Sequence, residues 1–130
     1  MITITKLSKV FRTEELETKA LSEISLTINK GDCVSIMGPS GSGKSTLLNI
    51  IGLLDSASRG SYELLGQEMV GLKEKQKSQA RKENIGFIFQ NFNSVIYFLY
   101  RKCFIHVDIL SNAIEHTIIQ TCRKLTIFTA

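Results

Sequence analysis

The sequence has little of what marks a secreted, metal-binding or membrane-spanning protein. Its three cysteines are an odd number and widely spaced, with no C-x-x-C pair, so neither a zinc site nor a disulfide framework is supported. The longest apolar run, at 95–100, falls far short of the roughly 18 residues that a membrane helix needs. Residues 1–6 alternate and lack a signal-peptide layout. We therefore expect a cytoplasmic chain that does not cross a membrane by itself.

The excess of basic over acidic side chains is small. The chain carries 16 basic and 12 acidic side chains, and residues 1–93 carry 12 and 10. No basic stripe interleaved with aromatic residues is present, so we expect no nucleic-acid partner. With 43% hydrophobic and 22% charged residues, the 130 residues suit one globular domain rather than a disordered tail.

Glycine is concentrated in one stretch, GPSGSGKST, which fits the phosphate-binding pattern G-x-x-x-x-G-K-[ST]. Its glycines let the backbone curl around a phosphate with amides facing inward, because no side chain blocks the approach. A lysine ammonium then reaches the β- and γ-phosphates, and the hydroxyl of Ser45 is placed to ligate Mg²⁺. The pattern predicts that a nucleotide triphosphate binds at Gly38, Pro39, Ser40, Gly41, Ser42, Gly43, Lys44, Ser45 and Thr46.

The flanking residues provide the context that this pattern requires. Residues 33–37 read as a short buried strand that ends at the loop, and 47–54 read as the helix that leaves it. The helix N-terminus carries partial positive charge toward the anion. The alternative is a chance Gly/Ser-rich turn between a strand and a helix, and the match at every fixed position argues against it.

Hydrophobic periodicity predicts further elements before and after the loop. Residues 1–11 alternate as a strand with one irregularity, and 20–28 alternate as a half-buried strand. These two form a hairpin-like pair that precedes the loop strand. The other predicted elements are a polar loop at 12–19, a turn at 29–32, a strand at 61–65, an exposed basic helix at 72–83 and a strand at 85–89.

The composition changes abruptly after residue 90. All nine glycines and the single proline precede residue 91, so the last forty residues lack both turn-formers. Apolar residues recur there at helical spacing, which indicates a possible helix, at Leu110, Ile114, Ile118, Cys122 and Leu125. A helix needs a core to pack against, so its structure stays open.

Residues 1 to about 93 resemble the ATP-binding subunit of ABC transporters. The resemblance is carried by GPSGSGKSTLLNIIGLLD, a glycine-bearing turn after it, and IGFIFQNFN. The long polar loop before Ala20 is similar to that of the subgroup serving macrolide export and lipoprotein release. The resemblance implies an α/β fold, here a truncated P-loop NTPase core with an antiparallel β subdomain. It implies ATP and Mg²⁺ as cofactors.

The resemblance also implies roles for residues outside the loop. Phe11 stands where the family has an aromatic, usually Tyr, that stacks on adenine; the alternative is a core residue of its strand. Gln90 stands where the family has a glutamine that reaches Mg²⁺ and the attacking water; the alternative is a surface side chain. Asp32 stands where Glu is common and is interpreted as structural. In intact relatives the partners are a membrane-spanning transporter subunit and a second ATP-binding subunit, at the inner face of the membrane.

The departures from the family are as informative as the match. The 130 residues contain no LSGGQ-like signature, no Walker B strand running into Asp-Glu, and no switch histidine. We therefore assign no catalytic residue, and we expect weak ATP binding with hydrolysis near background. Residues 94–130 are interpreted as an unassigned tail, and we hypothesise that a frameshift in an interrupted gene produced it.

Other functions remain open at this point. A truncated chain could act as a non-enzymatic regulator that binds a full-length partner, or it could be an inert remnant. Another P-loop class, such as a small-molecule kinase or a GTPase, is a further alternative; the kinase reading is disfavoured because kinases usually place the loop immediately after the first strand. Here two strands precede it.

Overall fold

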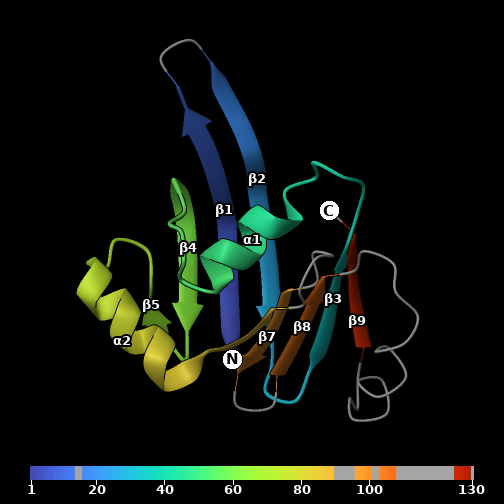
Figure 1. Ribbon diagram of the computed structural model, residues 1–130, viewed down its shortest axis with the longest axis vertical. Helices are drawn as coiled ribbons and strands as arrows, with labels where there is room; N and C mark the ends of the chain where they lie inside the picture. Colours follow the sequence, from blue (N-terminus) through green and yellow to red (C-terminus); the bar gives the residue numbers. More distant parts are fainter. Residues whose placement is uncertain (14–15, 90–95, 101–102, 108–124, 130) are drawn as a thin grey trace.

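The computed structural model describes residues 1–13, 16–89, 96–100, 103–107 and 125–129, which form two sheets and two helices (Figure 1). The first sheet is antiparallel in the order β2-β1-β4-β5, with β1 at Ile2–Arg12, β2 at Glu17–Ile28, β4 at Arg59–Leu64 and β5 at Gln67–Glu68. The second has the order β6-β7-β8-β3-β9, with β3 at Cys33–Met37, β6 at Gly86–Phe89, β7 at Ile96–Tyr100, β8 at Cys103–Val107 and β9 at Leu125–Thr129. The helices are α1 at Lys44–Ile51 and α2 at Glu74–Asn84.

The predicted hairpin is present and longer than expected. The pairing of β1 with β2 contains three register shifts rather than one irregularity, and Lys6 and Glu23 take positive φ angles of 48° and 50°. At these bulges, serine hydroxyls accept the hydrogen bonds of backbone amides that the irregular pairing displaces. The Lys6 amide donates to Ser25 Oγ at 3.0 Å, and the Glu23 amide donates to Ser8 Oγ at 3.0 Å. Because β1 runs to Arg12 and β2 starts at Glu17, the predicted loop at 12–19 is shorter than expected.

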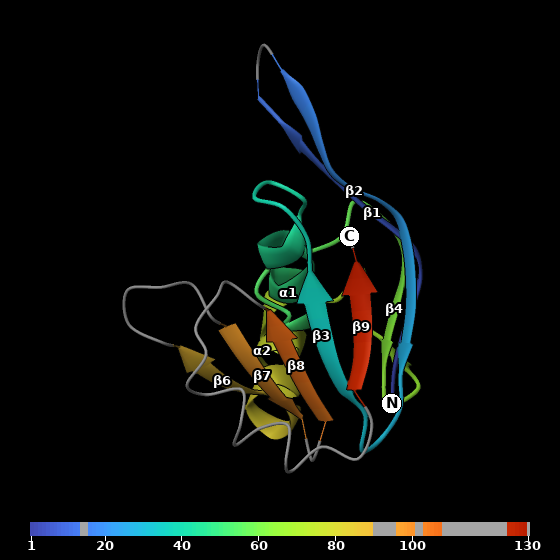
Figure 2. The same ribbon diagram turned by 90° about the vertical axis from the view of Figure 1, so that its right-hand side faces the viewer.

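One hydrophobic core joins the antiparallel sheet, β3 and α1. Figures 1 and 2 show α1 against one face of the antiparallel sheet, with β3 beside it. Leu47, Leu48 and Ile51 are buried on α1 because apolar residues recur at helical spacing there. Tyr62, on β4, is buried and donates its hydroxyl to the Ile51 carbonyl at 2.7 Å, which satisfies an acceptor at the helix end.

The tail supplies neighbours for the strand that precedes the loop. Both β8 and β9 pair with β3 in parallel, so that Val34 lies opposite Ile105 on one side and Thr126 on the other. The structure therefore places tail strands on both sides of β3, so that neither edge of this strand is left open. The predicted helix at 110–125 falls outside the described residues except for Leu125, which begins β9.

The basic helix is only partly a solvated face. Lys77 is 8% exposed, and its ammonium donates to the Ser56 hydroxyl. Arg81 donates to the Leu53 carbonyl and pairs with Glu74 at 2.6 Å. Two of the cations on α2 therefore hold the loop that follows α1, while the others lie exposed. Neither helix within the described ranges is long and apolar enough to cross a membrane.

The carboxylate of Glu68 closes the β4–β5 turn. One of its oxygens accepts hydrogen bonds from three backbone amides, those of Tyr62 at 3.0 Å, Met69 at 3.1 Å and Val70 at 2.9 Å. The other oxygen accepts the Ser61 hydroxyl. Burial by itself raises the pKa of Glu68, but these hydrogen bonds outweigh it and hold the pKa below the ordinary 4.5.

This arrangement predicts an acid-dependent loss of stability. A carboxylate with a lowered pKa stabilises the fold above its unfolded pKa, here 4.5, and that contribution disappears as the pH falls through the folded pKa. We expect Glu68→Gln to flatten the fall of the unfolding free energy below pH 4.5 in urea titrations. Glu63→Gln, on the facing strand, is the control. If the unfolding free energy of Glu68→Gln fell with pH as steeply as that of the parent protein, Glu68 would not be the source of this acid dependence.

Candidate functional site: the phosphate-binding loop

The predicted loop lies between β3 and the first turn of α1, and it faces the hairpin (Figure 1). A cavity of about 450 Å³ is lined by both the loop and the hairpin. It is lined on one side by residues 40–46 and on the other by Thr18, Lys19 and Ala20 of β2. Seven of the nine predicted loop positions line this cavity: Ser40, Gly41, Ser42, Gly43, Lys44, Ser45 and Thr46. The other two, Gly38 and Pro39, are joined to it through hydrogen bonds from Lys44.

Gly43 sets how closely the loop approaches β2. It is the N-cap of α1 with a φ of 87°, in the left-handed region that favours glycine. A Cβ atom there would lie 2.5 Å from the Ala20 carbonyl oxygen and 2.9 Å from Leu21 Cδ2. The backbone of the loop therefore packs directly on the backbone of β2, and no larger residue fits without displacing one of them.

Lys44 lies inside the loop rather than in solvent. The residue is 8% exposed, and its ammonium donates to the carbonyls of Gly38 and Pro39 at 2.7 Å each and lies 3.3 Å from Ser42 Oγ. The Ser42 amide donates to the same Pro39 carbonyl at 3.2 Å. A full positive charge and a backbone N–H thus converge on one oxygen. This geometry suits an anion, which accepts from such donors more strongly than a carbonyl does.

Ser45 and Thr46 occupy the first turn of α1, where backbone N–H groups have no partner within the helix. Ser45 is exposed and Thr46 is half-buried, and both line the cavity. Helix α1 has no acidic residue in this turn, so its positive end is not neutralised locally. Ser45 therefore brings a hydroxyl-bearing side chain to the lining of the cavity, in the same turn as the N–H groups without a partner in the helix.

Phe11 is not a core residue. It is 44% exposed near the end of β1, and its register partner on β2 is Thr18, which lines the loop cavity. Residues directly opposite on paired strands project to the same face, so Phe11 lies on the face of the hairpin that the loop adjoins. The ammonium of Lys9 lies 4.9 Å from the centre of its ring. Gln90, the other predicted contact, lies outside the described residues.

The turn before β3 is closed by its own side chains. Residues 29–32 read N-K-G-D, which has the letters of the guanine-specificity sequence N-K-x-D of GTPases. The carboxylate of Asp32 accepts two hydrogen bonds from Asn29, one from its backbone amide at 2.9 Å and one from its side-chain Nδ2 at 3.2 Å. Asp32 therefore has the structural role that was expected for it, and it is engaged within the turn.

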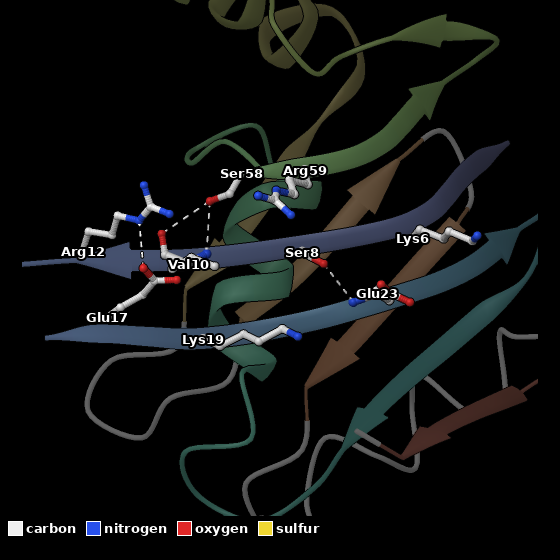
Figure 3. A pocket seen from close by; sticks show the side chains of 9 residues that line it. All are labelled: Lys6, Ser8, Val10, Arg12, Glu17, Lys19, Glu23, Ser58 and Arg59. Carbon is white, nitrogen blue, oxygen red and sulfur yellow. Dashed lines mark hydrogen bonds and ion pairs between the residues drawn. The ribbon is translucent and has the colours of Figure 1, made fainter.

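A second cavity, of about 500 Å³, lies on the opposite face of the hairpin (Figure 3). Its charges are of both signs: Lys6, Lys19 and Arg59 accompany Glu23, and Arg12 pairs with Glu17 at 3.1 Å. The two cavities share only Lys19. Mixed, exposed charges of this kind do not define a site for one ligand, so the loop cavity is the candidate site.

Sequence reasoning missed one group beside the site. Lys9 makes an ion pair with Asp55 at 2.7 Å and also donates to the Ser56 carbonyl at 2.8 Å. Strand alternation places Lys9 on the same face as Phe11, which is a signal that could have been used. Nothing in the spacing indicates Asp55, because it lies 46 positions away.

The comparisons with known proteins identify a family. A family model described as "ABC transporter" matches residues 21–124. The macrolide export ATP-binding/permease protein MacB of Bdellovibrio bacteriovorus is 52% identical over 93 residues, covering 72% of this chain and 14% of that protein. The bacitracin export ATP-binding protein BceA of Halalkalibacterium halodurans is 46% identical over 89 residues, covering 68% of this chain and 35% of that protein.

Solved structures show the same likeness. The dimeric bacterial ABC transporter cassette MJ0796 has a TM-score of 0.67 and 42% identity, covering 72% of this chain and 40% of that one. A post-hydrolysis dimer of the same cassette, bound to ADP and Pi, has a TM-score of 0.67 and 41% identity. The chain thus spans less than half the length of each of these relatives. The alignment with MacB is 93 residues long, and the family model, which matches residues 21–124, continues into the tail.

Proposed function

The chain belongs to the ABC transporter family, and on that premise we propose that it binds ATP with Mg²⁺ at the phosphate-binding loop. We propose further that it is the ATP-binding fragment of a subunit that energises export or lipoprotein release. One observation carries the proposal: the Lys44 ammonium and the Ser42 amide converge on a single acceptor, the Pro39 carbonyl, beside a glycine-lined cavity. The family match disfavours the kinase and GTPase alternatives.

The residues of the loop would divide the work of holding the nucleotide. The Lys44 ammonium and the Ser42 amide donate to the Pro39 carbonyl, and a phosphate oxygen would need the same two donors. Binding of the nucleotide would therefore replace a neutral acceptor, the carbonyl, by a charged one, the phosphate. Gly43 lets the loop approach β2 closely, and the start of α1 adds its partial positive charge. Mg²⁺ supplies neutralisation of the phosphate charge when it is bound, and Ser45 is the side chain placed to ligate it, with Gln90 proposed as the second.

Phe11 is proposed as the platform for the adenine ring. Its exposure and its position opposite Thr18 support this role, since a stacking platform must present a ring to the cavity that holds the phosphates. Stacking of a base on an aromatic side chain contributes roughly 1–3 kcal/mol in nucleic-acid binders, and we use that scale for the nucleotide.

The partners are proposed from the relatives. MacB is named as a joined ATP-binding and permease protein, and the MJ0796 cassette is dimeric. We propose that this chain associates with a membrane-spanning subunit and with a second ATP-binding subunit, peripherally at the inner face of the membrane. A pull-down against membrane subunits tests this association. Capture of a membrane subunit is expected if the chain is a transporter component or a non-enzymatic regulator, whereas no capture is expected if it is an inert remnant.

Titration of the purified protein with Mg·ATP by calorimetry tests the proposed function directly. We expect saturable binding, and we expect hydrolysis at the background rate, because these 130 residues carry no Walker B carboxylate pair and no signature sequence. Phosphate release is followed in the same samples. Turnover above background that disappears in Lys44→Ala would contradict the second expectation, and absence of binding would contradict the first.

We also propose that the tail from residue 94 is not family sequence and that a frameshift in an interrupted gene produced it. The loss of glycine and proline at one point motivates this hypothesis. Reading the genomic DNA downstream in the other two frames tests it. A frame encoding an LSGGQ-like sequence is expected, and its absence contradicts the frameshift.

A further inference from the structure

We propose that Lys9 is a positioning residue that braces the hairpin so that Phe11 meets the base of a nucleotide held by the phosphate-binding loop. This inference rests on the proposed function and deepens it, because it assigns a determinant of base recognition. Lys9 touches no ligand in this proposal. It acts through the ring of Phe11, whose centre lies 4.9 Å from its ammonium.

The first part of the argument is the anchor itself. The Lys9 side chain is 12% exposed, and its ammonium lies 2.7 Å from an Asp55 carboxylate oxygen and 2.8 Å from the Ser56 carbonyl. Burial by itself raises the pKa of Asp55, but the Lys9 hydrogen bond and charge, with the Ser56 amide and the charge of Lys77, outweigh it and lower the pKa. The pair is therefore charged and well formed, unlike an exposed ion pair that contributes little.

The second part is where the anchor lies. Asp55 and Ser56 belong to the loop that leaves the C-terminal end of α1, whereas the phosphate-binding loop enters its N-terminal end. The same segment is tied to β1 by two hydrogen bonds: the Ser58 amide donates to the Ser8 carbonyl at 2.9 Å, and the Val10 amide donates to the Ser58 hydroxyl at 3.1 Å. Helix α1 thus links the loop that binds phosphate to the part of β1 that carries Phe11.

The third part is the state of the ring. Phe11 is 44% exposed, so packing in a core does not hold its position. An ammonium over an aromatic face is attracted to it by roughly 0.5–1 kcal/mol at an exposed site. Lys9 thus lies over one face of the ring, and the proposal assigns the base to the other face. A platform held in advance loses less conformational freedom when the base stacks on it.

Binding measurements with two ligands distinguish a role of Lys9 in positioning the Phe11 ring from a general effect of its substitution on the fold. Mg·ATP carries a base, whereas Mg·tripolyphosphate carries only the phosphates. We expect Lys9→Met to weaken Mg·ATP binding about three- to tenfold, with tripolyphosphate binding changed less than about twofold. Asp55→Asn should act in the same direction. Lys9→Arg should retain most of the affinity, since a guanidinium can also pair with Asp55. Lys6→Met, which removes a charge from the opposite face of the same strand (Figure 3), is the control.

A readout without ligand makes the result independent of the proposed function. The sequence contains no tryptophan, so Phe11→Trp introduces a single indole at the proposed platform. In that background we expect Lys9→Met, but not Lys6→Met, to lower the fluorescence anisotropy of the indole and to raise its quenching by acrylamide. Equal losses for ATP and tripolyphosphate, or an unchanged anisotropy, would overturn the brace. A parent protein that binds neither ligand while Lys9→Met still lowers the anisotropy would overturn only the proposed function.

Discussion

Replacing Lys44 by alanine is expected to weaken Mg·ATP binding by at least about a hundredfold, or roughly 2.7 kcal/mol. The reason lies in the loop itself: the Lys44 ammonium lies 2.7 Å from two carbonyls of the loop, and the residue lines the cavity while being only 8% exposed, so its charge is poorly screened by solvent. Its removal leaves the backbone amides to hold a polyanion without a full positive charge. Tripolyphosphate binding should fall by a similar factor, because the lost contact is to phosphate.

Calorimetric titration measures this effect, and thermal unfolding checks it. ATP at a hundredfold excess over Kd should stabilise the parent protein by roughly 2.7 kcal/mol, and Lys44→Ala should lose that increment. Lys30→Ala, at an exposed position in the turn before β3, changes the net charge equally and is the control. Similar affinities in the parent protein and in Lys44→Ala would show that the loop is not the nucleotide site.

Replacing Gly43 by alanine is expected to destabilise the fold by roughly 2–4 kcal/mol, in addition to disrupting the loop. Two costs combine there. The φ of 87° is unfavourable for any residue with a Cβ, and that Cβ would lie 2.5 Å from the backbone oxygen of Ala20. Backbone on both sides of the contact cannot yield as a flexible side chain can, so the loop and β2 must separate.

Gly41→Ala is the matched control for this prediction. Gly41 has nearly the same φ, 84°, but a Cβ there meets nothing within 4 Å. It should cost only the conformational part, about 1 kcal/mol, in urea unfolding. Equal losses at the two positions would mean that the contact with β2 contributes nothing, and that the left-handed conformation accounts for the whole effect.

The predicted elements succeeded where their cause is local. The strand at 33–37, the helix after the loop and the strand at 61–65 lie within a few residues of their predicted bounds, because alternation and helical spacing are visible in short windows. Predictions failed where contacts between residues far apart in the chain determine whether a side chain is buried. Lys77 was expected on a solvated face of α2, yet it is buried against Ser56, and no local pattern records that contact.

The sequence by itself determined the phosphate-binding loop and the family, because glycines, one lysine and one hydroxyl must stand at set spacings to surround a phosphate, and such spacing is readable in nine letters. Only the tertiary structure decided what surrounds that loop. It placed β8 and β9 beside β3, put Phe11 outside the core, and joined Lys9 to Asp55 across 46 positions. Those contacts form between elements far apart in the chain, where the burial of one common core, rather than local spacing, selects which residues meet.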